Sequence, residues 1–280
     1  MNTHFPYFGK IFLTKSFIMY YKKAMEIIDD FLEKNEFSEF DDDVKGSLTY
    51  YLKFKQIRIN PQDEASVPLG ASKIYGLPHL PDSIKFPLGL NFIAQFNCSE
   101  LKPYDVDDIL PDKGIFYFFV DDSGVETSCH YYDGPLNELK IQDYPEQKGK
   151  LFYEKKFRIE PRTISFEESE ILVMETDSYW EEELGDLSSD LIDELQQELG
   201  DHLILDDEDE GGHIISGDYL FGDACFYQGD AEDEYDDYYS SLVFFCFGMG
   251  EGHVNFFIKN AKLDVNKDIN KQIVGVYSGT

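Results

Sequence analysis

Short runs of aromatic and aliphatic residues, separated by glycine- and proline-rich turns, most restrict the folds open to this sequence. The strongest run is Gly-Ile-Phe-Tyr-Phe-Phe-Val at residues 114–120, entered through a glycine. Phe and Tyr suit pleated, half-buried surfaces, and the chain carries 24 Phe and 19 Tyr. The sequence therefore predicts a protein rich in sheet. Further strands are expected at residues 55–59, 90–96, 151–159, 171–174, 242–247 and 254–258.

Three segments carry helix signals. Apolar residues recur at three- and four-residue spacing from Phe17 to Leu32, which is typical of an amphipathic surface helix. A shorter helix is expected to start near residues 41–43, because acidic side chains suit a helix N-terminus. A third begins at a serine cap, Ser188 or Ser189, and ends at Gly200. Helices and strands together predict an α+β fold.

Two regions of the chain resemble each other. Tyr75-Gly76-Leu77-Pro78 followed by the runs at residues 92–96 and 114–119 forms one series. Gly217-Asp218-Tyr219 followed by the runs at residues 243–247 and 252–257 forms the other. This similarity suggests an ancient duplication, with two related β-rich halves at about residues 61–162 and 163–280. We expect residues 1–60 to form an N-terminal helical segment and residues 61–280 one α+β domain, the whole being a single compact unit.

Negative charge is concentrated in one part of the sequence. The formal net charge is −32, and residues 163–258 contain 28 acidic residues and no Lys or Arg. Such a field repels nucleic acids and anionic membranes, whereas it attracts basic proteins and divalent cations. We therefore expect neither a nucleic acid nor a membrane as a partner. A basic protein is the kind of partner that this charge would attract.

The most acidic segment is Asp-Ala-Glu-Asp-Glu-Tyr-Asp-Asp-Tyr-Tyr at residues 230–239. It is either a solvated loop or a binding surface, where carboxylates pair with Lys and Arg and tyrosines supply contact area. As a binding surface it would use Asp230, Glu232, Asp233, Glu234, Tyr235, Asp236 and Asp237. The alternative function is a small-ligand-binding protein or enzyme with a pocket between the halves, near Gln95 and His213.

Metal and cofactor motifs are weak. Asp206, Glu208 and Glu210 imitate the first ligands of an EF-hand loop, but its twelfth position is Gly217 instead of a bidentate Glu. These three residues stay weak candidates for a divalent cation, and a solvated acidic loop is favoured. The alternate glycines at positions 248, 250 and 252 favour a hairpin turn over a phosphate-binding loop. No cofactor and no catalytic residue is predicted, so the interpretation leans towards a protein that is not an enzyme.

The cysteines and the N-terminus indicate a cytoplasmic protein. Cys98, Cys129, Cys225 and Cys246 lie far apart and form no Cys-x-x-Cys pair, as expected for reduced thiols in the cytosol. No signal peptide is evident, because the apolar stretch at residues 11–21 is interrupted by a lysine and has no cleavage site.

Ser-Lys-Ile-Tyr-Gly-Leu-Pro-His-Leu-Pro at residues 72–81 resembles the opening motif of the YwqG-like family, a domain of unknown function. Segments at residues 92–96, 110–119, 213–219 and 252–258 resemble the later family elements in the same order, so the resemblance covers about residues 14–270. Tyr75 and Ser216 stand where the family has glycine, and Tyr219-Leu220 stands where it has Tyr-Pro.

The resemblance implies a mixed α+β fold and transfers no catalytic residue, because the family has no established activity. Members in bacterial toxin–immunity neighbourhoods give a hint of an interaction role. We therefore expect an acidic interaction protein that is not an enzyme, and an immunity factor against a basic toxin is one form of it.

Overall fold

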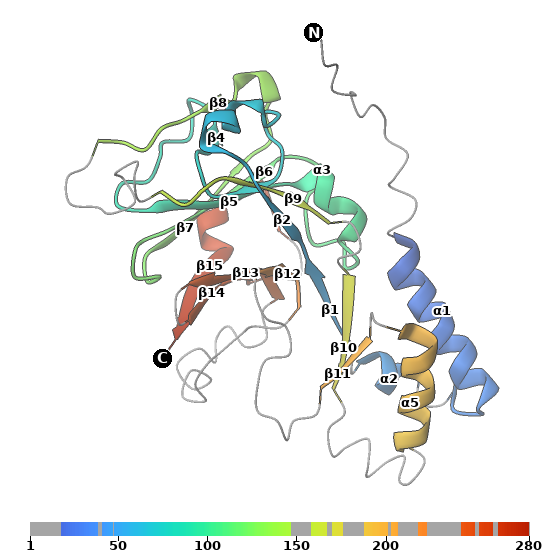
Figure 1. Cartoon of the computed structure of the whole chain (residues 1–280). Coiled ribbons are helices and arrows are strands. Elements are labelled where there is room, and N and C mark those ends of the chain that lie inside the picture. Colours follow the sequence, from blue (N-terminus) through green and yellow to red (C-terminus); the bar gives the residue numbers. More distant parts are fainter. Residues whose placement is uncertain are drawn as a thin grey trace.

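The computed structural model shows a body of two large β-sheets with three helices, α1, α2 and α5, gathered at one end (Figure 1). It describes residues 18–38, 41–46, 48–146, 158–166, 170–175, 188–200, 203–206, 218–222, 242–249, 252–259 and 263–279. The helices are α1 (Ile18–Lys34), α2 (Asp41–Gly46), α3 (Cys98–Leu101) and α5 (Ser188–Leu199). Short 3₁₀ turns are η2 (Pro61–Ser66), η3 (Lys102–Tyr104), η4 (Leu136–Glu138) and η10 (Ile269–Lys271). None of the described helices is long and apolar enough to cross a membrane.

The seven-stranded sheet has the order β11-β10-β1-β12-β13-β14-β15. Its neighbours pair antiparallel, except that β10 and β11 run parallel. Its strands are β11 (Leu203–Asp206), β10 (Glu170–Glu175), β1 (Leu48–Lys53), β12 (Tyr219–Leu220), β13 (Leu242–Met249), β14 (Gly252–Ile258) and β15 (Ile273–Gly279).

The six-stranded sheet is antiparallel throughout and has the order β2-β9-β3-β5-β6-β7. Its strands are β2 (Lys55–Arg58), β9 (Arg162–Ser165), β3 (Lys73–Ile74), β5 (Asn91–Asn97), β6 (Ile115–Val120) and β7 (Thr127–Tyr132). The strands β4 (His79–Leu80) and β8 (Lys140–Ile141) pair antiparallel and form a separate two-stranded sheet. This sheet-dominated architecture with a few helices agrees with the predicted class.

Most of the expected elements are confirmed to within a residue or two. They are the three helices and the strands at residues 55–59, 90–96, 114–120, 171–174, 242–247 and 254–258. The hairpin at the alternate glycines is also confirmed, because Met249 pairs with Gly252. Of the strand expected at residues 151–159, residues 151–157 lie outside the described residues. Residues 158 and 159 are not in a strand, and β9 begins only at Arg162.

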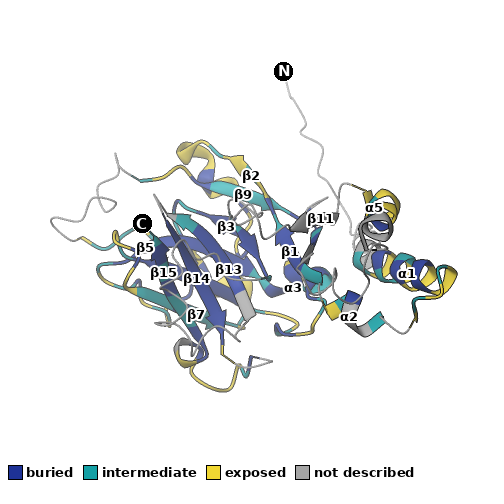
Figure 2. Cartoon of the chain, turned by 90° about the horizontal axis from the view of Figure 1, so that it is seen from below, coloured by how far each residue is buried: buried dark blue, intermediate teal, exposed yellow. Residues whose placement is uncertain are grey.

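Aromatic side chains hold the two sheets face to face. The Phe118 ring of β6 lies 5.4 Å from the Phe245 ring of β13 and 4.8 Å from the Phe256 ring of β14. Phe54, the single residue between β1 and β2, packs 5.9 Å from Phe96 and 6.4 Å from Phe245. The chain thus passes from one sheet to the other at a buried aromatic residue. Every residue of β6 and of β14 is buried, and β14 is dark blue in Figure 2.

Both faces of β6 are buried, each in a different core. Phe116, Phe118 and Val120 pack in the main cluster between the sheets. Ile115, Tyr117 and Phe119 alternate with them and pack in a second cluster with Leu80 and Leu139. Side chains of a strand alternate between its faces, so an uninterrupted apolar run is required where both faces are covered.

The two large sheets share a local arrangement. In each, a two-residue strand, β3 or β12, is followed by a left-handed pair, Tyr75-Gly76 or Phe221-Gly222, with φ between 58° and 78°. The Tyr75 amide donates to the Ile93 carbonyl, and the Phe221 amide donates to the Phe244 carbonyl. The two acceptor residues, Ile93 and Phe244, both lie at a register shift, the first in the β5–β6 pair and the second in the β13–β14 pair. Here the counterpart of Tyr75-Gly76 is Phe221-Gly222, whereas the sequence comparison matched it with Gly217-Asp218-Tyr219, and duplication stays a prediction.

The edges of the two sheets meet at β7 and β15. Thr127 of β7 lies so close to Gly275 of β15 that a Cβ at position 275 would fall 2.6 Å from the threonine methyl group. A glycine is therefore required at this crossing, since any side chain would force the two strands apart.

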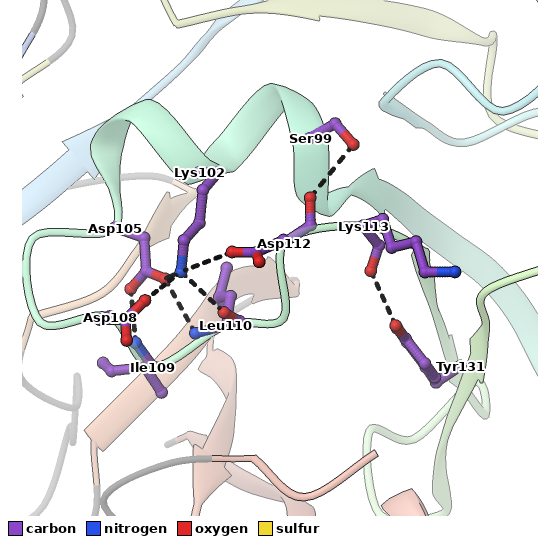
Figure 3. A network of polar contacts seen from close by, with 9 residues as sticks. All are labelled: Ser99, Lys102, Asp105, Asp108, Ile109, Leu110, Asp112, Lys113 and Tyr131. Carbon is purple, nitrogen blue, oxygen red and sulfur yellow. Dashed lines mark hydrogen bonds and ion pairs between the residues drawn. The ribbon is translucent and has the colours of Figure 1, made fainter. Parts of the chain in front are cut away.

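A lysine-centred network closes the loop between α3 and β6 (Figure 3). Lys102 Nζ lies 3.1 Å from Asp105 and donates to the Leu110 carbonyl at 2.9 Å, and it also contacts Asp108. The Asp105 carboxylate accepts the amides of Ile109 and Leu110, both at 2.9 Å. Because Asp105 is buried, its charge is stabilised by these donors, and the loop is held against the sheet.

Glu170 gives the folded protein a pH-dependent stability. Burial raises the pKa of this carboxyl from 4.5 to about 7, against the opposing hydrogen bond from Tyr50 at 3.3 Å. The folded state therefore holds a proton that the unfolded chain releases between pH 4.5 and 7, and this contribution to stability is lost as pH rises through that window. In urea denaturation at pH 5 and pH 8, we expect Glu170→Gln to gain stability relative to wild type at pH 8 but not at pH 5. An equal gain at both pH values would contradict this assignment.

Candidate functional site

A cavity of about 300 Å³ lies between β5 of the six-stranded sheet and β13 of the seven-stranded sheet. Its wall is mainly apolar and aromatic, with a few polar side chains. The lining residues are Tyr75, Gly76, Asn91, Phe92, Ile93, Asp121, Tyr144, Arg158, Ile159, Phe247 and Gly248. Ile159 is 39% exposed and places part of this wall near solvent.

Tyr75 forms one wall and is held in an unusual conformation. Its φ is 58°, in the left-handed region where glycine is favoured and other residues are strained. The ring packs 5.8 Å from the Phe247 ring, and the Arg162 guanidinium lies 5.1 Å from its centroid. Burial and the nearby Asp218 raise the pKa of the Tyr75 phenol, so it stays neutral at physiological pH. These contacts offset the backbone strain and fix the ring in the wall.

Arg158 and Tyr144 form a second wall. The Arg158 guanidinium lies 4.6 Å from the centroid of the Tyr144 ring and makes a 2.7 Å ion pair with Asp143. The Tyr144 hydroxyl accepts a hydrogen bond from the Phe92 amide at 3.2 Å, which ties this wall to β5. Because Asp143 neutralises the arginine, this wall carries no excess positive charge.

Asn91 and Asp121 supply the acceptors of a third wall. Asn91 Nδ2 donates to Asp122 at 2.7 Å, and a carboxylate can only accept, so the orientation of the amide is determined. Asn91 Oδ1 is buried and has no hydrogen-bond partner among the described residues. A buried acceptor without a donor carries an uncompensated desolvation cost.

A polar cluster behind the cavity joins the two sheets. The Asp218 carboxylate accepts the Gly248 amide at 2.9 Å and the Gln56 side chain at 2.7 Å. Arg162 donates to the other end of the Gln56 side chain. Burial raises the pKa of Asp218, and the Gly248 and Gln56 donors act against that rise. The cluster holds the end of β13 in position beside β2 and β9.

The motif at residues 72–81 builds the protein interior next to the cavity. Lys73 is fully buried and pairs with Glu64 at 2.5 Å, and it also donates to the Leu77 carbonyl at 2.8 Å. Gly76, at φ 68°, passes so close to Glu64 that a Cβ would lie 2.1 Å from the carboxylate oxygen. Lys73 Nζ also lies 5.8 Å from the centroid of Phe92, a lining residue.

His79 and Gln95 complete this interior network. The Gly70 amide donates to His79 Nδ1 at 3.1 Å, so Nδ1 carries no proton in the neutral ring and Nε2 does. Burial, with a smaller effect of Lys73, lowers the pKa of His79 to about 4. Gln95 is fully buried, accepts from the His79 amide at 2.9 Å and donates to the Ala71 carbonyl at 2.8 Å.

Of the residues singled out from sequence as site candidates, the structure describes only Gln95 and Asp206. Gln95 supports the motif and does not line the cavity. Asp206 is the last residue of β11 and pairs with Glu175. Glu208, Glu210, His213 and the acidic segment at residues 230–237 lie outside the described residues. Among the residues that are described, no group of three or more His, Cys, Asp or Glu could hold a metal ion. Cys98, Cys129 and Cys246 are buried free thiols, and Cys225 falls outside the described part.

Sequence reasoning missed the residues that line the cavity. Asn91 and Arg158 belong to no local motif, and Phe247 entered only as part of the strand-like run at residues 243–247. Tyr75 gave a more specific signal, as the tyrosine standing where the resembled family has glycine. The structure shows why that position is unusual, since the backbone there is left-handed.

Fold and cavity define a sheet-rich protein with a mainly apolar pocket between two packed β-sheets. The chain belongs to the family described as a domain of unknown function, DUF1963, whose model matches residues 72–273. The match begins at Ser72, the first residue of the Lys73 motif. A comparison with curated proteins found no match.

Proposed function

We propose that this protein binds a small molecule in the cavity between β5 and β13. The observation that carries the proposal is the buried Asn91 Oδ1, an acceptor without a donor in the wall of a cavity lined mainly by aromatic and apolar groups. Ligand sites combine an apolar body with a few oriented polar groups, and a volume of about 300 Å³ is at the lower end of their range. The ligand is therefore small.

The pocket is built to keep its shape. Its walls come from different parts of the chain, and each is fixed by contacts outside the cavity. Asp218 holds Gly248, Asp122 holds Asn91, and Asp143 holds Arg158. A pocket formed before binding costs a ligand little ordering free energy.

A matched pair of tryptophan variants tests this proposal. Ile159 lines the cavity and Ile57 of β2 does not, and both isoleucines are partly exposed, at 39% and 56%. We expect Ile159→Trp to fill part of the cavity and Ile57→Trp to leave it open. A library of small metabolites is screened by thermal shift against wild type and both variants. We expect some compounds to raise the Tm of wild type and of Ile57→Trp but not of Ile159→Trp. If no compound separates the two variants, the proposal is wrong.

A second candidate is an acidic interaction protein, and one specific observation favours it. Residues 163–258 carry 28 acidic residues and no Lys or Arg, which suits a basic partner such as a toxin. The YwqG-like resemblance and its toxin–immunity neighbourhoods point the same way. A pulldown at low and high salt, with charge reversal at residues 230–237, tests this candidate. Partner binding that is insensitive to salt would exclude it.

We also propose that the two β-rich halves arose by duplication. The shared two-residue strands, left-handed pairs and register shifts support this origin, because such backbone details recur together when a unit is copied.

A further inference from the structure

We propose that Tyr75 is the residue that limits the size of the ligand in this cavity. This inference rests on the proposed function and adds a specificity-determining residue to it. The Tyr75 ring closes the cavity on the side of Arg162, and without the ring the cavity would extend towards that guanidinium. The inference follows from the position of the ring, from the contacts that fix it and from the strain in its backbone.

The Tyr75 ring stands between the cavity and a polar side chain that does not line it. Tyr75 and Phe247 are both lining residues, and their rings lie 5.8 Å apart. Arg162 is not a lining residue, although its guanidinium lies 5.1 Å from the centroid of the same Tyr75 ring. The ring therefore contacts the cavity wall on one side and the guanidinium on another. Its removal would join the two spaces and leave room for a larger ligand.

The neighbouring strands fix the position of this ring. Ile74, the last residue of β3, pairs with Arg162 of β9, which brings the arginine next to the following tyrosine. On the other side, the Tyr75 amide donates to the carbonyl of Ile93, another lining residue, at 2.8 Å. Because β5 and β9 hold the backbone and two side chains pack against the ring, Tyr75 forms a fixed part of the wall.

The backbone of Tyr75 is strained in a way that its side chain has to offset. Its φ is 58°, a conformation that glycine adopts freely and tyrosine does not. Phe221, at the matching place in the other sheet, has a φ of 63°, and its ring is buried in the main core, so packing accounts for it. The Tyr75 ring is only partly buried, and it lies at the cavity instead. Strain of this kind is typical of functional positions.

Three neutral probes that differ by one ring each test the size limit: phenol, 2-naphthol and 9-phenanthrol. Calorimetry at pH 7 compares wild type with Tyr75→Gly and Tyr75→Phe. We expect 9-phenanthrol to bind Tyr75→Gly about tenfold or more tighter than wild type, because burial of its third ring in the vacated space removes apolar surface from water. Phenol needs no additional space and should gain less than about threefold. Tyr75→Phe keeps the ring and should behave as wild type.

Further variants show where the larger probe binds. The gain for 9-phenanthrol should disappear when Tyr75→Gly is combined with Ile159→Trp, which fills part of the cavity, and persist when it is combined with Ile57→Trp. Tyr75→Ala also lacks the ring and should show the gain of Tyr75→Gly. Its Tm should be lower than that of Tyr75→Gly, because alanine keeps the left-handed strain that glycine relieves.

Two results would overturn the assignment. One is equal affinity of 9-phenanthrol for wild type and Tyr75→Gly, and the other is a gain that survives in the combination with Ile159→Trp. Absence of binding of all three probes to Tyr75→Gly also contradicts it. The metabolite screen judges the proposed function separately: compounds that discriminate between the two tryptophan variants would keep the small-molecule function while the role of Tyr75 falls.

Discussion

Replacing Lys73 by methionine is expected to lower the free energy of unfolding by about 3–5 kcal/mol. The substitution leaves the Glu64 carboxylate buried without its cation, and it removes the donor to the Leu77 carbonyl. Glu64 would keep the Leu77 amide, which donates to it at 2.6 Å, but one amide does not replace an ammonium group in a buried site. Urea denaturation at pH 7 measures the loss.

Two further variants show whether the loss comes from the unpaired charge. Lys73→Met combined with Glu64→Gln should recover part of the stability, because the remaining partner is then neutral. Lys140→Met breaks the exposed ion pair with Asp82 and should hardly change stability, since both side chains are mostly in water. A Lys73→Met variant as stable as Lys140→Met would show that the buried pair is not needed.

The second large effect is expected at the contact between the sheets, where Phe118→Ala should cost about 3–5 kcal/mol. The Phe118 side chain is fully buried, and its ring lies 4.8–5.8 Å from the rings of Phe96, Phe244, Phe245 and Phe256. Alanine would leave a void between rigid β-sheets that cannot close around it, so both transfer free energy and packing are lost.

A control for Phe118→Ala is Val125→Ala, a truncation at a side chain that is 72% exposed in the turn after β6. We expect its effect on the free energy of unfolding to stay within about 0.5 kcal/mol. If Phe118→Ala cost less than about 2 kcal/mol, the two sheets would tolerate a cavity at their centre, contrary to the close packing expected of a protein interior.

The motif at residues 72–81 stabilises the fold next to the cavity and does not itself supply the site. Lys73, His79 and Gln95 are buried and engaged with one another's backbone or with Glu64. Sequence reasoning placed Gln95 near a pocket between the two halves. The structure gives it another role: its amide joins the His79 backbone to the Ala71 carbonyl.

Elements with a strong local period could be predicted from the sequence. The apolar stripe of α1, the serine start of α5 and the left-handed Gly200 after it need only neighbouring residues to be recognised. The run at β6 is equally clear. Several strands were missed, and β1, β7 and β15 among them show that the reasons differ from strand to strand.

Strand β7 reads Thr-Ser-Cys-His-Tyr-Tyr, and only Cys129 in it is buried. Its strand character comes from pairing with β6. Strand β15 contains Gly275 and Gly279, which weaken a strand signal, yet Gly275 is what allows β15 to approach Thr127. Strand β1 is separated from β2 by Phe54 alone. The sequence analysis expected only one strand here, at residues 55–59, whereas the chain forms two strands that belong to different sheets.

The sequence by itself determined the strand-rich class, the main helices and the concentration of charge, because these depend on residue type and on spacings of two or 3.6 residues. Only the tertiary structure decided the cavity. Tyr75, Asn91, Arg158 and Phe247 are far apart in the chain, and they share a wall because two sheets pack face to face. Asn91 Nδ2 donates to Asp122, and this contact turns Oδ1 of the same amide towards a place without a donor. Asn91 and Asp122 are far apart in the sequence, so no local pattern records this arrangement.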